Sequence, residues 1–334
     1  MSITGSRRPI LSVRHLKVDH AMPREALWRA PGRIRAVDDV HLDLFPGETL
    51  GVVGESGCGK STLARSLIGL QPVSSGQILL DGDNVTQRSE AAWRPLRRKV
   101  QMVFQDPLAS LDPRMTIGEI VEEPLRALAP ELDATERERR VLKMLDQVGL
   151  PQRYRNRYPH EFSGGQCQRA GIARALILRP KVLICDEPVS ALDVSIQAQI
   201  INLLADLQKE TGLAMLFIAH DLAVVRHISH RVLVMYMGRI MEAASRDMLF
   251  SRPAHPYTRA LLSAVPTADP ARLAQRIILK GELPDPANPP SGCVFRTRCP
   301  LVAPECASRK PGLRRVTPES HSACHFASDP ELAA

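Results

Sequence analysis

A glycine-rich segment that ends in lysine, serine and threonine is the clearest chemical signal in the chain. Residues 54–62 fit the pattern G-x-x-x-x-G-K-S/T. In this pattern the glycines let backbone N–H groups curl around phosphate oxygens, and the lysine adds a positive charge. The residues predicted to bind nucleotide here are Gly54, Glu55, Ser56, Gly57, Cys58, Gly59, Lys60, Ser61 and Thr62. Lys60 is the expected ligand of the β and γ phosphates.

Two adjacent carboxylates, Asp186 and Glu187, supply a second part of a phosphate-chemistry site. A Mg²⁺ ion bound by the Ser61 hydroxyl needs a further oxygen ligand from the end of a neighbouring strand, and Asp186 stands at such a position. Glu187 can then polarise the attacking water. A solvated acidic pair at a strand end is the structural alternative.

The elements around these residues fit that chemistry. A buried strand over 49–53 leads into the glycine loop, and a helix over 61–70 leaves it. The apolar run 181–185 predicts a strand covered on both faces by helices. Strands and helices alternate over about residues 10–105 and 180–250, which indicates an α/β fold with a mainly parallel sheet.

The stretch between those regions has helical periodicity. Residues 116–128 and 135–148 each repeat apolar side chains at helical spacing. In the second segment the residues that share one face are Val141, Leu142, Leu145 and Val148, and the charged residues 136–140 lie opposite. Two amphipathic helices are therefore predicted.

A third motif, Ser163 with Gly164, Gly165 and Gln166, precedes the helix-like segment 167–178. Free N–H groups at a helix start attract anions, although an ordinary capped helix start has the same sequence. With the glycine loop before it and Asp186 after it, the chain resembles the ATP-binding subunits of ABC transporters over nearly its whole length. The resemblance implies a P-loop ABC ATPase cassette whose signature motif, residues 163–166, faces ATP held by another subunit.

Further positions match this family one by one. Gln105 resembles the Q-loop glutamine, which senses Mg²⁺ and water and links to the membrane partner. Asp193 resembles the D-loop aspartate in the nucleotide site, and His220 the switch histidine that contacts the γ phosphate. The resemblance thus implies Glu187, His220 and Gln105 as catalytic residues. The implied Mg²⁺ ligands are Ser61, Gln105 and Asp186.

Relatives in this family stack adenine on an aromatic residue just after the first strand. Here the strand over 13–18 leads into His20, whose imidazole can stack with less area than tyrosine. Trp28 is a rival, although a tryptophan in this Pro-rich and Arg-rich stretch can equally cover the edge of the domain.

Residues 252–262 resemble the C-terminal signature of the oligopeptide and dipeptide importer branch, and specifically its second, dipeptide-type ATPase subunit. A Pro-rich linker follows at 283–290. Four of the seven cysteines come after it, namely Cys293, Cys299, Cys306 and Cys324. The other three lie inside the ATPase motifs, and we assign them no ligand role.

Several interpretations of these four cysteines stay open. A reducing cytoplasm disfavours disulfides. Tetrahedral zinc is chemically feasible, but the paired C-x2-C spacing of structural zinc sites is absent. The importer branch carries a 4Fe-4S cluster on a matching tail, so the resemblance implies an iron–sulfur cluster. Free thiols are the remaining alternative.

Length and composition fit one large domain with an appendage. The chain has 334 residues, 44% of them apolar, and a formal net charge of +8. We expect an ABC ATPase domain over 1–250, with a helical subdomain at about 107–178, and an importer-type C-terminal region over 251–334. No apolar run reaches the roughly 20 residues of a membrane span, and residues 1–9 do not resemble a secretory signal. The basic runs lack nucleic-acid motifs, so no nucleic-acid partner is predicted.

The resemblance implies an ATPase at the cytoplasmic face of the inner or plasma membrane that energises import of dipeptides or oligopeptides. Its expected partners are a second, paralogous ABC ATPase subunit, two transmembrane permease subunits and a solute-binding protein. Nickel or glutathione importers use related subunits. Two other hypotheses are a soluble ABC-type ATPase that acts on DNA or ribosomes, and an ATPase governed by a redox-sensing cysteine tail.

Overall fold

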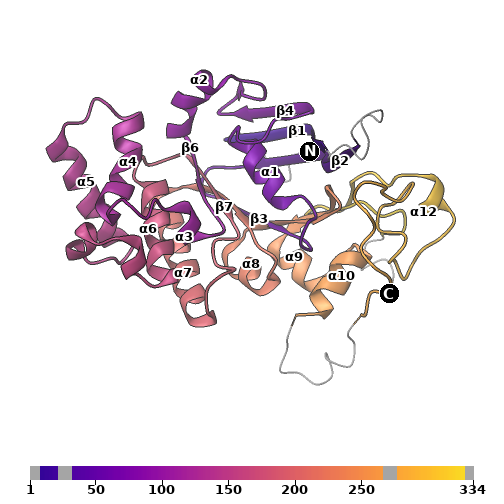
Figure 1. The fold of residues 1–334 in the computed structure, drawn as a ribbon. Coiled ribbons are helices and arrows are strands. Elements are labelled where there is room, and N and C mark those ends of the chain that lie inside the picture. The colour runs from indigo at the N-terminus through magenta and orange to yellow at the C-terminus, as the bar shows by residue number, and fades with distance from the viewer. Residues whose placement is uncertain (1–7, 22–31, 266–276, 328–334) are drawn as a thin grey trace.

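The computed structural model describes residues 8–21, 32–265 and 277–327. Within these ranges the strands form two sheets, and helices lie around them on several sides (Figure 1). The smaller sheet has the order β2-β1-β4-β5 and is antiparallel throughout. Its strands are β1 (Leu11–Ala21), β2 (Arg33–Leu44), β4 (Ser75–Leu80) and β5 (Asp83–Asn84).

The larger sheet has the order β11-β12-β10-β9-β3-β8-β7-β6. Its central pairs, from β9 to β6, are parallel, whereas β10, β12 and β11 join one edge in antiparallel pairs. The strands are β3 (Thr49–Val53), β6 (Val100–Val103), β7 (Val182–Asp186), β8 (Ala214–Ile218), β9 (Arg231–Tyr236), β10 (Arg239–Ser245), β11 (Arg314–Thr317) and β12 (Ser320–Ser322). The predicted parallel core is confirmed.

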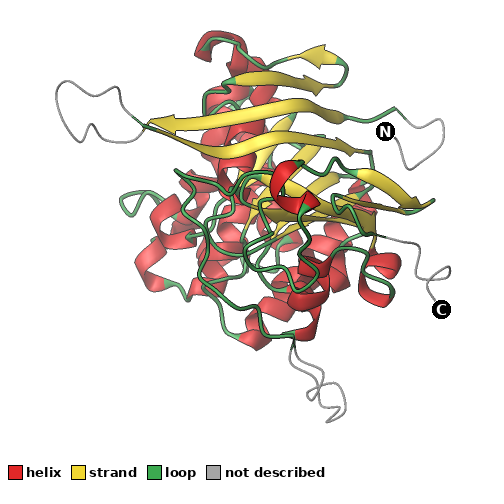
Figure 2. Cartoon of the chain, turned by 90° about the vertical axis from the view of Figure 1, so that its right-hand side faces the viewer, coloured by secondary structure: helices red, strands yellow, loops and turns green. Residues whose placement is uncertain are grey.

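One difference from the sequence prediction lies in the first hundred residues. The alternation expected over 10–105 is only partly present, because β1, β2, β4 and β5 form the separate antiparallel sheet. This sheet forms one end of the molecule, at the top of Figure 2, and most helices gather at the other end. Helix α1 (Lys60–Leu67) packs between the two sheets in a shared apolar core.

The central strands are buried on both faces, as their apolar sequence predicts. In β7, Leu183 and Cys185 contact the core under the helices, whereas Val182 and Ile184 contact the core that includes α1. This alternation follows from the two-residue period of a strand. The strand that ends at Asp186 is therefore held firmly from both sides.

Residues 107–176 contain helices, and the described chain has no strand between β6 and β7. The longer helices are α4 (Ile117–Leu128), α5 (Ala134–Gln147) and α6 (Gly164–Leu176), with α3 (Pro107–Ser110) and the 3₁₀ turns η2 (Gln152–Asn156) and η3 (Pro159–Glu161) between them. Side chains of Thr116 and Asp133 cap α4 and α5 by accepting backbone N–H bonds. Both predicted amphipathic helices are thus confirmed to within a residue or two.

The remaining helices cover the larger sheet and its edge. They are α7 (Val194–Thr211), α8 (Leu222–Ile228), α9 (Arg246–Ser251), α10 (Pro256–Ser263) and α12 (Glu305–Ser308), with α2 (Glu90–Trp93) and η1 (Arg94–Arg98) beside the antiparallel sheet. The C-terminal region is not a detached tail, since β12 pairs with β10 and Phe295 is fully buried in the main core. Among the described helices, we find none with the length and apolar character that a membrane span requires.

Candidate nucleotide site

The glycine loop runs from the end of β3 at Val53 to the start of α1 at Lys60. Gly59 has a φ of 103°, and a Cβ atom there would lie 2.0 Å from the Ala36 carbonyl oxygen, so only glycine fits. No side chain caps the first turn of α1. Its free N–H groups and the positive end of the helix dipole therefore suit a phosphate group.

Lys60 places a buried positive charge beside this loop. Its Nζ atom donates to the carbonyl oxygens of Gly54 and Glu55, at 2.8 and 3.0 Å. The same atom lies 3.8 Å from Oε1 of Glu187. One ammonium group thus connects the phosphate loop with the end of β7.

Ser61 and Asp186 lie together, as their predicted role as Mg²⁺ ligands requires. The Ser61 hydroxyl donates to Oδ1 of Asp186 at 2.9 Å. Burial raises the pKa of Asp186, whereas the hydrogen bond from Ser61 acts in the opposite direction. A hydroxyl and a carboxylate are hard oxygen ligands of the kind that Mg²⁺ prefers, so this pair fits the ion.

Three predicted catalytic side chains meet at one carboxylate. Oε2 of Glu187 accepts a hydrogen bond from Nε2 of Gln105 at 3.2 Å and lies 3.4 Å from Nδ1 of His220. These residues follow β7, β6 and β8, whose carboxyl ends meet at one edge because the strands are parallel neighbours. Glu187 also has a φ of 47°, a left-handed conformation that non-glycine residues adopt rarely and often at functional sites.

A cavity of about 800 Å³ opens beside these residues. Residues 56–62 of the glycine loop line it together with His20, Gln105 and Glu187. His20 has its Nε2 atom 3.2 Å from the Thr62 hydroxyl, so the imidazole lies next to the phosphate loop. The rival aromatic residue, Trp28, lies outside the described residues. The sequence did not predict that the Pro-rich segment 283–287 would line the same cavity.

The signature residues occupy a different part of the fold. Ser163 and Gln166 form a reciprocal capping box at the start of α6. Gly165 packs closely on α7, since an added Cβ atom would lie 2.4 Å from the Ile196 side chain. Asp193 caps α7 by accepting from the Ile196 N–H at 3.1 Å. Neither residues 163–166 nor Asp193 are among those that line the 800 Å³ cavity.

Comparison with known proteins agrees with these motifs. The family model described as ABC transporter matches residues 37–190, and that of the oligopeptide/dipeptide transporter C-terminal region matches residues 241–306. The oligopeptide transport ATP-binding proteins OppF of Escherichia coli and Salmonella typhimurium are 57% and 56% identical to this chain, each over 93% of the chain and 95% of the relative. The chain belongs to the ABC transporter ATP-binding subunits, in the oligopeptide importer family.

Solved structures give the same fold. The ATP-binding cassette MJ0796, in a dimeric post-hydrolysis state bound to ADP and Pi, has a TM-score of 0.63 and 29% identity, over 71% of this chain and 98% of that chain. CbiO1 of Clostridium perfringens has a TM-score of 0.62 and 30% identity, over 73% of this chain and 91% of its own. The predicted P-loop ABC cassette is therefore confirmed, and the protein is an ATP-hydrolysing ABC ATPase that uses ATP and Mg²⁺.

In this ABC ATPase the phosphate loop is also bound to the C-terminal region, which the sequence motifs did not reveal. The Glu55 N–H donates to the Tyr257 hydroxyl at 3.1 Å, and the Glu55 carboxylate pairs with Arg298. Tyr257 lies within the importer signature, but no feature of the sequence indicates its contact with Glu55, which is 202 positions away. Tyr236, Tyr257 and Phe295 form a buried aromatic cluster behind these contacts, with ring centroids 4.8 to 5.4 Å apart.

The four C-terminal cysteines of the ATPase converge, although they come from separate segments of the chain. Cys293, Cys299, Cys306 and Cys324 all line one small cavity, together with His255 and Pro256 at the start of α10. The Cys293 N–H donates to the Cys306 carbonyl oxygen at 2.8 Å. Burial raises the pKa of Cys299 to about 11 and also raises that of Cys293 and Cys324. These thiols must therefore lose their protons when a metal centre binds.

Proposed function

We propose that this ABC ATPase drives the import of oligopeptides or dipeptides across a membrane, through ATP sites that it shares with a second ATPase subunit. One observation carries the proposal. The glycine loop, Gln105 and Glu187 line one cavity, and His220 lies against Glu187, whereas the signature residues 163–166 lie elsewhere on α6. This separation supports ATP sites in which the glycine loop of one chain is completed by the signature residues of its partner.

The residues divide the chemical work as follows. Lys60 and the uncapped start of α1 neutralise the phosphates. Ser61 and Asp186 would hold Mg²⁺, which neutralises charge on the phosphate oxygens when bound. Glu187 accepts the proton of the attacking water as general base. Gln105 and His220 hold its carboxylate and orient the water.

The domain organisation follows from the same division. We propose an ABC ATPase domain over 1–250 and a C-terminal region over 251–334. The helices of 107–178 form a subdomain that carries the signature motif and turns about a hinge near Gln105. Closure of two subunits on ATP, and reopening after hydrolysis, would then transmit force through the Q-loop to the membrane partner.

The partners follow from the family. We propose two transmembrane permease subunits, a solute-binding protein and a paralogous second ATPase, with this chain bound to the permeases at the cytoplasmic face of the membrane. The names of the OppF relatives support oligopeptides as the solute. The importer-type signature, which includes Tyr257 and lies against the phosphate loop, supports the same branch.

For the cysteine cavity we propose a 4Fe-4S cluster held by Cys293, Cys299, Cys306 and Cys324. Zinc is the alternative. All four thiols line one small cavity, which supports a single metal centre there. Bound there, the cluster would join four chain segments next to α10.

Affinity purification of the chain from native membranes, with mass spectrometry of the proteins that accompany it, tests the function. Two multispanning permeases, a second ATPase and a solute-binding protein are the expected result. Recovery with ribosomal or DNA-bound proteins and without permeases would overturn the transport role and favour the soluble ABC-type ATPase. A permease pair with a nickel- or glutathione-binding protein would overturn the peptide substrate alone.

A further inference from the structure

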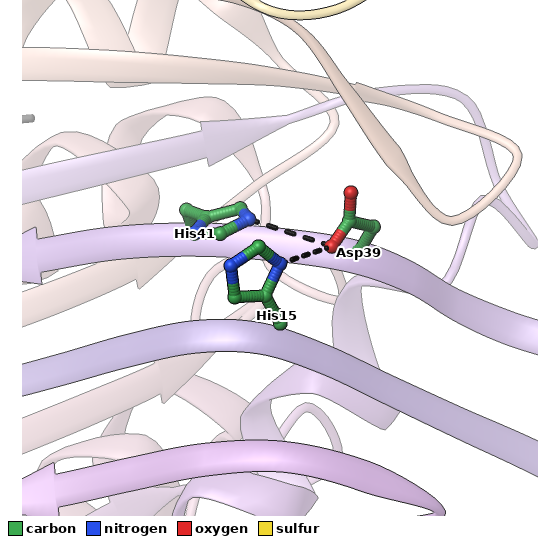
Figure 3. A group of neighbouring side chains, drawn as sticks. All are labelled: His15, Asp39 and His41. Atoms are coloured by element: carbon green, nitrogen blue, oxygen red, sulfur yellow. Dashed lines mark hydrogen bonds and ion pairs between the residues drawn. The ribbon is translucent and has the colours of Figure 1, made fainter. Parts of the chain in front are cut away.

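A compact group of three side chains lies on the antiparallel sheet, outside the nucleotide site. His15 comes from β1, and Asp39 and His41 come from β2 (Figure 3). Nδ1 of His15 lies 2.9 Å from Oδ1 of Asp39, and Nε2 of His41 lies 3.4 Å from the same oxygen. One ligating atom from each residue lies within 4.8 Å of the other two.

We propose that His15, Asp39 and His41 bind a divalent transition-metal ion of the zinc class. Bonds from Zn²⁺ to imidazole nitrogen and carboxylate oxygen are about 2.0 to 2.2 Å long, so tetrahedral ligand atoms lie roughly 3.3 to 3.6 Å apart. Octahedral ligands at that bond length lie about 2.9 Å apart. The 3.4 Å separation between Asp39 Oδ1 and His41 matches the tetrahedral spacing, and the 2.9 Å separation between Asp39 Oδ1 and His15 matches the octahedral spacing. Two imidazoles and a carboxylate suit zinc, copper or nickel better than Mg²⁺.

An irregularity of the sheet brings the three residues together. The strand pairs around them are Val13 with Leu42, Leu16 with Val40, and Lys17 with Asp38. His15, Asp39 and His41 all occupy positions that this pairing skips. A bulge changes the direction in which a side chain points, and here two bulged strands direct three ligands toward one another.

The backbone at two of these residues is unusual. His15 and Asp39 have φ angles of 49° and 61°, in the left-handed region that only a few per cent of non-glycine residues adopt, although Asp and His do so more often than most. Each conformation turns its side chain out of the regular strand pattern. The group therefore depends on backbone geometry, and not only on the chance proximity of exposed side chains.

The neighbouring cations are bound to other carboxylates. Arg14 donates to both oxygens of Asp43, and Lys310 lies 3.4 Å from Asp38, although its charge also reaches Asp39. Within the described part of the chain, the hydrogen-bond and ion-pair partners of the Asp39 carboxylate are the two imidazoles. An ion bound between these three groups would take the place of a proton that an imidazole nitrogen directs at this oxygen.

The group is open to solvent. The side chains of His15, Asp39 and His41 are 73%, 40% and 36% exposed, so an ion could enter and keep water in its remaining positions. Bound metal would cross-link β1 to β2. Because β1 continues to His20 beside the nucleotide cavity, the ion would stiffen the strand that carries this residue.

Titration of the tag-free, full-length protein with Zn²⁺, after chelator treatment, tests the proposal. The cysteine cavity is a competing site, so the same titration is repeated with Co²⁺. Cobalt bound to nitrogen and oxygen lacks the sulfur-to-metal charge-transfer absorption that a thiolate site produces. We expect one equivalent of Co²⁺ to bind and to produce ligand-field bands without the charge-transfer absorption of a thiolate site. Bound Zn²⁺ should also raise the thermal unfolding temperature, because it binds only the folded state.

Matched variants assign the site. His15→Asn keeps a residue that tolerates the left-handed backbone, and Asp39→Asn does the same while it removes the charge. Each substitution should lower the affinity for this one equivalent of metal by at least about tenfold. Loss of a group that only supports a ligand already costs a metal site about tenfold in affinity. His227→Ala, an exposed histidine on α8 that contacts Asn202, should leave it unchanged. Binding that is equal in the wild type and both variants, or that shows only thiolate absorption, would overturn the proposal.

Discussion

Arg298 directs both terminal nitrogens of its guanidinium at the Glu55 carboxylate, at 2.7 and 3.2 Å. The two residues are 243 positions apart, yet they join the C-terminal region to the phosphate loop. The guanidinium side chain is 11% exposed and the carboxylate side chain 22%, so water screens the pair only weakly. Bidentate geometry adds both strength and a defined orientation.

Breaking this pair should therefore weaken both the fold and nucleotide binding. We expect a double-mutant cycle of Arg298→Ala and Glu55→Gln to give a coupling energy of roughly 1 to 3 kcal/mol in denaturant unfolding. ATP affinity should fall in each single variant, because the loop loses a support. Arg296→Ala is the control, since Arg296 contacts Ser291 and not Glu55. Strictly additive effects of the two substitutions would show that the pair does not couple.

Glu187→Gln should abolish most hydrolysis while it preserves ATP binding. The amide keeps the shape of the side chain, but it cannot accept a proton from water, which costs about 10² to 10⁴ in rate. Turnover is measured with the partner subunits present, and ATP affinity in the same preparation. Near-normal turnover would remove Glu187 from the role of general base.

Ser61→Ala and Asp186→Asn should selectively remove the effect of Mg²⁺. Both residues contribute oxygen ligands, and their side chains already share a hydrogen bond of 2.9 Å. We expect wild-type affinity for ATP to rise when Mg²⁺ is added, and this rise to be lost in both variants. Binding of metal-free ATP should change little, because Lys60 and the helix start are intact. Equal Mg²⁺ dependence in the wild type and the variants would contradict the assignment.

His255 should make the stability of the C-terminal region depend on pH. It is 1% exposed, its Nδ1 atom accepts from the Tyr257 N–H, and burial lowers its pKa to about 3. In the unfolded chain an imidazole titrates near pH 6.5. The unfolded state therefore binds a proton that the folded state does not as the pH falls below 6.5. The contribution of the neutral His255 to the free energy of unfolding is therefore complete above pH 6.5. Below that value it falls by about 1.4 kcal/mol per pH unit, down to about pH 3.

His255→Asn isolates this effect, because asparagine can still cap α10 but does not titrate. Between pH 6.5 and 5, the unfolding free energy of the wild type should fall by about 2 kcal/mol more than that of the variant. Denaturant unfolding at several pH values measures the difference in unfolding free energy between the two proteins. The effects of the other titrating groups cancel in this difference, because both proteins contain them. Parallel pH curves for the two proteins would exclude a neutral, buried imidazole.

Serine at any one of the four C-terminal cysteines should remove iron and sulfide from protein purified without oxygen. Each sulfur lines the same cavity, so the loss of one leaves the cluster incompletely bound. Cys167→Ala, which changes a buried thiol in α6, should keep the wild-type content. About one zinc per chain in place of iron would support the zinc alternative, and no metal in the wild type would leave the cysteines as thiols. ATPase rates measured at different cluster contents then distinguish a cluster that only stabilises the fold from one that controls the ATPase through its redox state.

Much of the active half-site was predictable from the sequence because its information is local. A glycine loop between an apolar strand and a helix, or Asp186 and Glu187 after a buried strand, can be recognised within about ten residues. The resemblance to the ABC family implied that Gln105, Glu187 and His220 act together, and the structure gives the physical reason, because the carboxyl ends of parallel strands meet at one edge. Apolar periodicity similarly predicted the helix that begins after Thr116, and the segment at Ser163 had the sequence of a capped helix start.

The sequence by itself thus determined the motifs, most element types and the nature of the nucleotide chemistry. Only the tertiary structure decided that the first strands form a separate antiparallel sheet, that Arg298 binds Glu55, and that skipped strand positions unite His15, Asp39 and His41. The physical reason is that strand register and contacts between distant segments depend on how the whole core packs. A local pattern specifies which groups a segment offers, but packing selects which of them meet.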